Sequence, residues 1–147
     1  MDETIEEVPR ALAVPAWFRI ASWLALAWEL FGCAAFVVQM TTAPETLPVD
    51  QQRLWAATPI WMTAAYTLAV LSGLAGAVQL LRRKIGAPGL LLVSLIAVIV
   101  QFSALMIDPR LRQLTSDDML TGPMIIILAC YAIFQLALVA RRRGWLD

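Results

Sequence analysis

Four long apolar runs, each bounded by charged or proline-containing segments, divide the 147-residue chain. They cover residues 17–40, 59–81, 85–107 and 123–140. Because a helix needs about 20 apolar residues to cross the hydrocarbon core of a bilayer, each run is long enough for one membrane span. A chain that is 61% apolar also has too little polar surface to cover a water-soluble globule of its size. The sequence predicts an all-α membrane protein, with residues 1–147 forming one domain, an up-down-up-down bundle of four transmembrane helices in a lipid bilayer.

The basic residues indicate an orientation for this bundle. Eight of the eleven Lys and Arg fall on the side of the membrane that holds both termini, and these are Arg10, Arg19, Arg82, Arg83, Lys84, Arg141, Arg142 and Arg143. Basic residues near span ends are enriched on the cytoplasmic side. We therefore expect residues 1–16 to form a cytoplasmic N-terminal segment and residues 141–147 a basic cytoplasmic tail. The acidic start "MDETIEEVPR" does not fit a signal peptide, so the first span is expected to be an uncleaved anchor.

The residue inventory argues against several chemistries. The chain has no histidine, the commonest general base and a frequent metal ligand. Its two cysteines, Cys33 and Cys130, fall inside spans and form no C-x-x-C pair, so we interpret them as small apolar fillers. We expect no metal site, no cofactor, no enzymatic activity and no nucleic-acid partner.

One ionisable residue interrupts the first apolar run, in "WLALAWELFGCAAFVV". A charged side chain at the centre of a bilayer costs roughly 2.5–3.5 kcal/mol on insertion scales, so Glu29 needs a reason to be there. Arg19 lies ten residues away, about 15 Å along a helix, and cannot pair with it. Burial without a cationic partner disfavours the charged form, so the default is a neutral, hydrogen-bonding acid at pH 7. The candidate partners at similar depth are Tyr66, Thr67, Ser72, Tyr131, Gln101 and Gln135.

Small residues predict which helices approach closely. At four-residue spacing or beside it, the first two spans carry Gly32, Ala69, Gly73, Gly76 and Ala77. Small side chains at such spacing let helix backbones come together in membranes. We therefore predict a packed seam between the first and second spans, with Glu29 in it.

Local signals predict the ends of the helices and the outer loops. Thr58 is expected as an N-cap with Pro59 at the first helical position, and Pro123 at the first position of the fourth span. The segments "LPVDQQRLWAA" and "DPRLRQL" are each expected to form one or two helical turns at the outer surface. Tryptophans mark the interfaces, with Trp17 and Trp145 on the inner side.

Glu29 allows two interpretations. In the functional one it exchanges a proton while the protein moves a solute. In the structural one it is a polar group that holds two helices together, worth about 1–2 kcal/mol.

Several motifs resemble a known family. These are Trp28 with Gly32 in the first span, Pro59 with Trp61 at the start of the second, Gly73 with Gly76 before the basic turn, and the closing "RRRGWL". The chain is similar to small four-helix bacterial inner-membrane proteins that often carry a provisional "sugar transporter" label. The resemblance implies a multi-pass protein of the bacterial inner membrane. It also implies a hydrogen-bonding rather than a titrating role at Glu29, because an asparagine is common at that position in the family.

The leading functional expectation is a small integral membrane protein that works as an accessory or oligomeric component, with solute handling as one role. The alternative is a transporter protomer for a sugar or another small solute, proton-coupled through Glu29, with Tyr66 and Tyr131 lining the path. Four spans enclose little space, so we expect a homo-oligomer or another membrane protein as partner.

Overall fold

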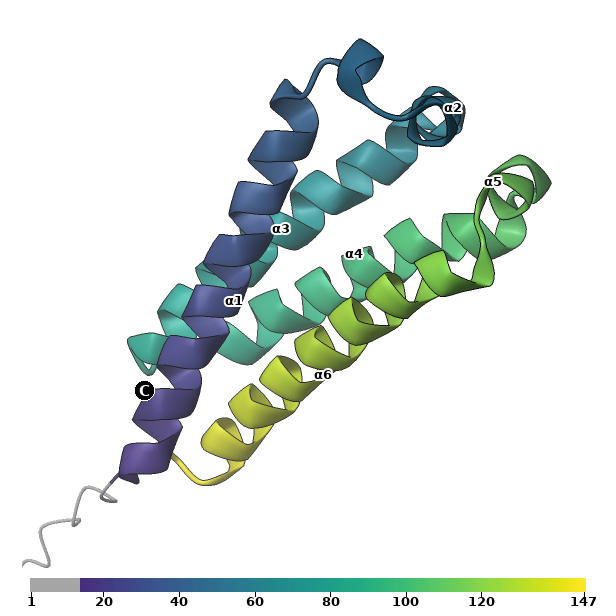
Figure 1. Cartoon of the computed structure of the whole chain (residues 1–147). Helices are drawn as coiled ribbons and strands as arrows, with labels where there is room; N and C mark the ends of the chain where they lie inside the picture. The colour runs from purple at the N-terminus through teal and green to yellow at the C-terminus, as the bar shows by residue number, and fades with distance from the viewer. Residues whose placement is uncertain (1–13) are drawn as a thin grey trace, which may run out of the picture.

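The computed structural model describes residues 14–147, which form helices joined by short connections, with no strand in that part of the chain (Figure 1). The helices are α1 (Ala16–Thr41), η1 (Pro44–Thr46), α2 (Val49–Ala57), α3 (Ile60–Leu81), α4 (Ala87–Ile107), α5 (Pro109–Leu114), η2 (Asp117–Leu120) and α6 (Thr121–Arg142). Most of the predicted N-terminal segment, residues 1–13, lies outside the described residues.

The four predicted spans are confirmed as helices. α1, α3, α4 and α6 are each long and apolar enough to cross a membrane, and they alternate in direction (Figure 1). The start of α1 and the end of the chain lie together, since the rings of Trp17 and Trp145 are 5.6 Å apart. We call this the terminal end, and the opposite end, which carries α2 and α5, the loop end. The compartment that each end faces stays a prediction.

The helices pack in chain order rather than as a closed ring. α3 packs most extensively against α4, α1 packs against α3, and α6 packs against α4. α1 and α6 make no comparable contact, so the bundle is open along one side. The tight α3–α4 pair follows from the short connection between Leu81 and Ala87, which forces the two helices to be antiparallel neighbours.

Two predicted helix starts were wrong. Thr58 ends α2 instead of capping α3, and its hydroxyl donates to the carbonyl of Leu54 at 2.8 Å. Pro59 takes the N-cap position of α3. A backbone N–H at this position would have no partner within the helix, so its absence in proline costs no hydrogen bond. α6 begins at Thr121, two residues before Pro123, because η2 already turns the chain into a helical path.

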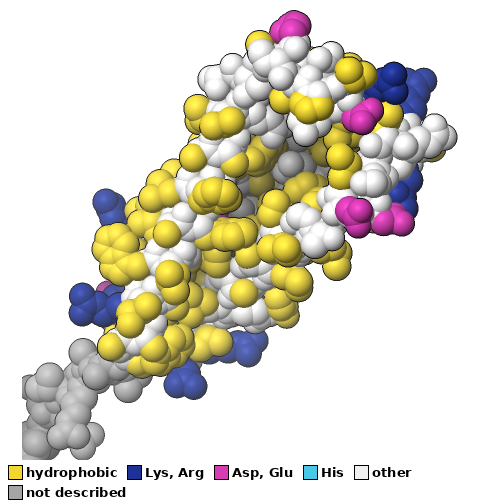
Figure 2. Space-filling view, viewed as in Figure 1, with side chains coloured by type: hydrophobic (Ala, Val, Ile, Leu, Met, Phe, Trp, Pro, Cys, Tyr) yellow, Lys and Arg dark blue, Asp and Glu magenta, His cyan; other side chains and the backbone are white. Residues whose placement is uncertain are grey.

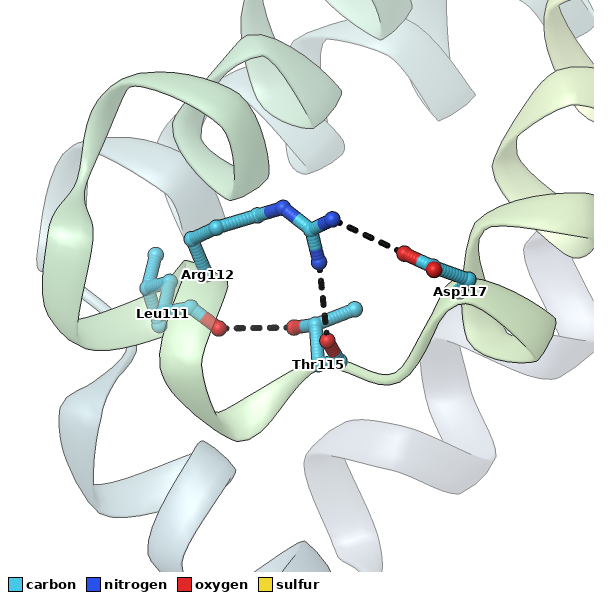
Figure 3. A network of polar contacts seen from close by, with 4 residues as sticks. All are labelled: Leu111, Arg112, Thr115 and Asp117. Carbon is cyan, nitrogen blue, oxygen red and sulfur yellow. Dashed lines mark hydrogen bonds and ion pairs between the residues drawn. The ribbon is translucent and has the colours of Figure 1, made fainter.

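The outer segments form short helices, as predicted. Asp108 is the N-cap of α5, and its carboxylate accepts a hydrogen bond from the backbone N–H of Arg110 at 2.9 Å. Arg112 then joins α5 to η2, donating to the Thr115 carbonyl at 3.1 Å and to the Asp117 carboxylate at 2.8 Å (Figure 3). The Arg112–Asp117 pair is exposed and worth at most about 1 kcal/mol. The fully buried side chain of Leu111 anchors the segment more strongly.

The terminal end is closed by the C-terminal residues, which the sequence interpretation had placed at the membrane interface. α6 ends in a Schellman motif: Gly144 has φ +66°, and the Trp145 N–H donates to the Ala140 carbonyl at 2.9 Å. This turn sends the chain back across the bundle, so Trp145 is only 4% exposed. It belongs to a buried cluster made of Phe18, Leu80, Ala87, Leu91, Ala137, Ala140, Trp145 and Leu146. Trp145 is therefore a core residue rather than an interfacial anchor.

The last residues also pair with the α3–α4 turn. The Asp147 N–H donates to the Arg83 carbonyl at 2.6 Å, and the Ile85 N–H donates to the Asp147 carbonyl at 2.9 Å. The Arg83 guanidinium Nε donates to the Trp145 carbonyl at 2.9 Å. All four spans are thus tied together at this end, because the strap from α6 pairs with the α3–α4 turn and also covers the start of α1.

The small residues of α3 are buried as predicted, but they serve two neighbours rather than one. Gly73 faces both Glu29 of α1 and Ser94 of α4, whereas Gly76 faces α4. A Cβ at Gly76 would lie 2.7 Å from Leu91 Cγ and 3.1 Å from the Leu91 backbone nitrogen. Gly32 is not at a close helix contact, because nothing lies within 4 Å of a Cβ built there.

We expect Gly76→Ala to lower the free energy of unfolding by about 1–3 kcal/mol, because the added methyl overlaps the buried Leu91 side chain and crowds its backbone nitrogen. Gly89→Ala is the matched control, since a Cβ at Gly89 meets nothing within 4 Å. Denaturant titration of the purified protein in a mild detergent measures both. Equal stability of the two variants would contradict the close α3–α4 approach.

Candidate functional site

Two connected cavities lie between the spans. The inner one, which we call the chamber, has a volume of about 270 Å³ and is lined by all four spans, with Glu29 in its wall. The outer one, which we call the vestibule, has a volume of about 620 Å³ and lies beneath α2 and α5. The residues that line both are Ala35, Gln39, Tyr66, Gln101 and Phe102. The vestibule therefore adjoins the chamber on its loop-end side, and Gln39, Tyr66 and Gln101 supply the polar groups at their common boundary.

Glu29 is placed by the buried face of α1. It is 7% exposed and follows Phe18, Ser22 and Ala25 along that face. Its carboxyl lies against Gly73 of α3: the Glu29 Cδ is 2.8 Å from the position that a Gly73 Cβ would take, and a carboxyl oxygen is closer still. The absence of a side chain at Gly73 thus makes the space that the carboxyl occupies.

Two buried side chains end in the chamber without a protein partner. Within residues 14–147, no hydrogen bond joins the Glu29 carboxyl or the Gln101 amide to another group. Gln101 is 8% exposed. Neither side chain has a fully enclosed polar atom, so their polar ends reach the cavity. An amide and a carboxyl left open in this way can bind a hydrogen-bonding ligand from two sides.

Of the six candidate partners of Glu29, the structure brings only some to the chamber. Tyr66 and Gln101 line it. Thr67 and Ser72 instead donate to carbonyls of their own helix, those of Thr63 at 2.9 Å and Leu68 at 2.6 Å.

The two candidates on α6 lie elsewhere. Tyr131 is 49% exposed on the outer surface, because its neighbour Cys130 points into the chamber and successive side chains on a helix are about 100° apart. Gln135 is half-buried and lines neither chamber nor vestibule. Tyr131 therefore lines neither the chamber nor the vestibule, and its role on a solute path stays a prediction.

Sequence reasoning missed three polar or aromatic residues of the site. Gln39 lies ten residues after Glu29 and about 80° away around the α1 axis, so helical periodicity counted from Glu29 does not select it. Ser94 of α4 donates across the helix interface to the Ala69 carbonyl at 2.8 Å, and its hydroxyl lies beside Gly73. Trp28 lines the chamber next to Glu29. The apolar run has no periodicity that could distinguish this position of Trp28 from a lipid-facing one.

The electrostatics of the site are simple. Glu29 is the one acidic side chain among the residues that line the chamber and vestibule, and no Lys or Arg lines either. In the described part of the chain, no group of three His, Cys, Asp or Glu side chains is placed to hold a metal ion. The arrangement can accept and donate hydrogen bonds and can hold one negative charge or one proton.

No protein-family model matches the chain, and no curated protein or solved structure is significantly similar to it. The resemblance to four-helix inner-membrane proteins therefore stays a prediction. The fold identifies the chain as a small multi-pass membrane protein.

Proposed function

We propose that the protein binds a small polar solute in the chamber and vestibule and serves as a transporter protomer. One observation carries this proposal: Glu29 and Gln101 are more than nine-tenths buried, reach the cavity, and have no partner among residues 14–147. Because their polar atoms are open to the cavity, a solute with donor and acceptor groups can bind them there in competition with water.

The shape of the path supports a transport role. The vestibule reaches the chamber from the loop end, whereas the Trp145 cluster fills the terminal end. Access from one side at a time is how transporters with a central site work. Glu29 would sit at the bottom of the path, where proton exchange could be coupled to solute binding.

The accessory role remains the second candidate, and the open side of the bundle favours it. α1 and α6 expose most of their apolar surface, so either another copy of the chain or a different membrane protein could pack there. The distribution of basic residues supports a bacterial inner-membrane location with both termini in the cytoplasm.

Labelling with dicyclohexylcarbodiimide, an apolar reagent that modifies carboxylic acids, tests the proposal. In lipid vesicles at neutral pH we expect mass spectrometry to find the modification at Glu29 and to lose it in Glu29→Gln. A panel of glucose, glycerol, ethanolamine and tetramethylammonium is then added at millimolar concentrations. We expect at least one of them to slow the labelling several-fold.

Gly73→Ala provides a second variant that keeps the acid but moves it, because the new methyl takes the place of the carboxyl. We expect it to label at a changed rate and to lose the protection by solute. Absence of labelling in the wild-type protein, or labelling that no member of the panel slows, would contradict a solute site at Glu29.

A further inference from the structure

A second cavity adjoins the chamber on the open side of the bundle. This groove has a volume of about 410 Å³ and runs between residues 21–28 of α1 and residues 129–136 of α6. Its lining consists only of Ala, Leu, Ile and Trp side chains. A groove of this composition within the hydrocarbon core offers no hydrogen bond and suits a hydrocarbon chain.

The groove and the chamber share one wall. Trp28 lines both cavities, and its ring lies 6.5 Å from that of Phe31, which also lines the chamber. Phe31 of α1 and Ile126 of α6 line the chamber on the side where these two helices do not pack together, so the chamber opens laterally between them. Figure 2 shows the hollow between the α1 side and the α6 side, bordered by hydrophobic side chains.

The charges around the cavities restrict which ligand head groups can bind in the chamber. No Lys or Arg lines the chamber, the vestibule or the groove, and Glu29 is the one acid. An anionic head group would therefore lose its hydration without gaining a cationic partner. An uncharged or cationic head with hydrogen-bond donors complements Glu29 and the Gln101 amide.

We infer that the ligand is a single-chain amphiphile that enters from the bilayer between α1 and α6. Its uncharged or cationic polar head lies in the chamber, and its alkyl chain lies in the groove beside Trp28. This inference rests on the proposed function, because the head group of the amphiphile takes the place of the small polar solute at the same polar site. It adds an alkyl chain to the ligand and a lateral route beside the one through the vestibule. The apolar lining of the groove carries it, together with the position of the groove end to end with the chamber along the gap between α1 and α6, where the two meet at Trp28.

Photocrosslinking with three probes tests the inference. Each probe has a 16-carbon chain with a diazirine near its end, and the heads are a primary amine, a hydroxyl and a sulfonate. In phosphatidylcholine vesicles we expect the amine and hydroxyl probes to label residues 21–28 and 129–136 at least several-fold more than other lipid-facing residues. The sulfonate probe should label all lipid-facing residues alike.

Ala132→Phe fills the groove and should abolish the selective labelling, because Ala132 lines it and is exposed. Ala27→Phe is the matched control, since Ala27 is also exposed but lines no cavity. Uniform labelling by all three probes, or crosslinks between two copies of the chain through Ala132→Cys, would overturn the inference. If small solutes still protect Glu29 in that case, the proposed function stands without the amphiphile.

Discussion

Trp145→Ala is expected to lower the free energy of unfolding by about 3–5 kcal/mol, the usual cost of removing a large aromatic side chain from a packed core. Trp145 is 4% exposed and its ring contacts the rings of Trp17 and Phe18 at 5.6 and 5.3 Å. The loss would also free the strap that joins α6 to the α3–α4 turn. Denaturant titration in mild detergent, followed by circular dichroism, measures the effect.

Trp23→Ala is the matched control, because Trp23 is 59% exposed on the membrane-facing surface of α1. We expect it to change the free energy of unfolding by less than about 1 kcal/mol, as surface substitutions usually do. If both variants lose similar stability, Trp145 acts as an interfacial anchor, and the closure of the terminal end is not as described.

Glu29→Leu is expected to have opposite effects on stability and on binding. Replacing the Glu29 carboxyl by an apolar side chain of similar size should raise the free energy of unfolding by up to about 2.5–3.5 kcal/mol, the cost of a charged side chain at the centre of a membrane span. The same change should abolish solute binding. Because Glu29→Leu has no carboxyl for carbodiimide to label, binding is measured in the Gln39→Cys background, as the protection of this cysteine by solute against a thiol reagent. Stability lost to function in this way is common at binding sites.

Ser94→Ala separates this result from a general effect of polar groups in the bundle. Unlike Glu29, Ser94 makes a hydrogen bond to a protein group, the Ala69 carbonyl. Loss of this bond should lower the free energy of unfolding by about 0.6 kcal/mol. If Glu29→Leu is also destabilising, Glu29 is holding helices together, and the structural interpretation of this residue is correct.

The architecture was predictable because membrane spans leave a strong signal. Each of the four apolar runs became a helix with ends within a few residues of those expected, since the length of a span is set by the bilayer. Glu29 could be singled out for the same reason: a carboxyl is conspicuous where every neighbour is apolar. The small residues of α3 were also correctly expected to be buried.

The composition of the site was less predictable, because it depends on how each helix is rotated. In an apolar run, Tyr131 and Cys130 look equally suited to face the bundle, and only the packing of α6 on α4 decides between them. Thr67 and Ser72 had their own backbone available as an acceptor, a local alternative that residues in helices often take. The burial of Trp145 depends on the turn at Gly144, which the tail sequence does not distinguish from an exposed end.

The infrared carbonyl band of the Glu29 carboxyl, recorded in lipid bilayers with Glu29→Gln as the subtraction control, tests the central claim most directly. The claim is that this carboxyl faces a ligand site rather than a protein partner. We predict a band typical of an acid without a strong protein hydrogen bond, which shifts when a solute that protects Glu29 from carbodiimide is added. A band that already shows a strong hydrogen bond and that no solute shifts would contradict the claim and leave Glu29 as a structural residue.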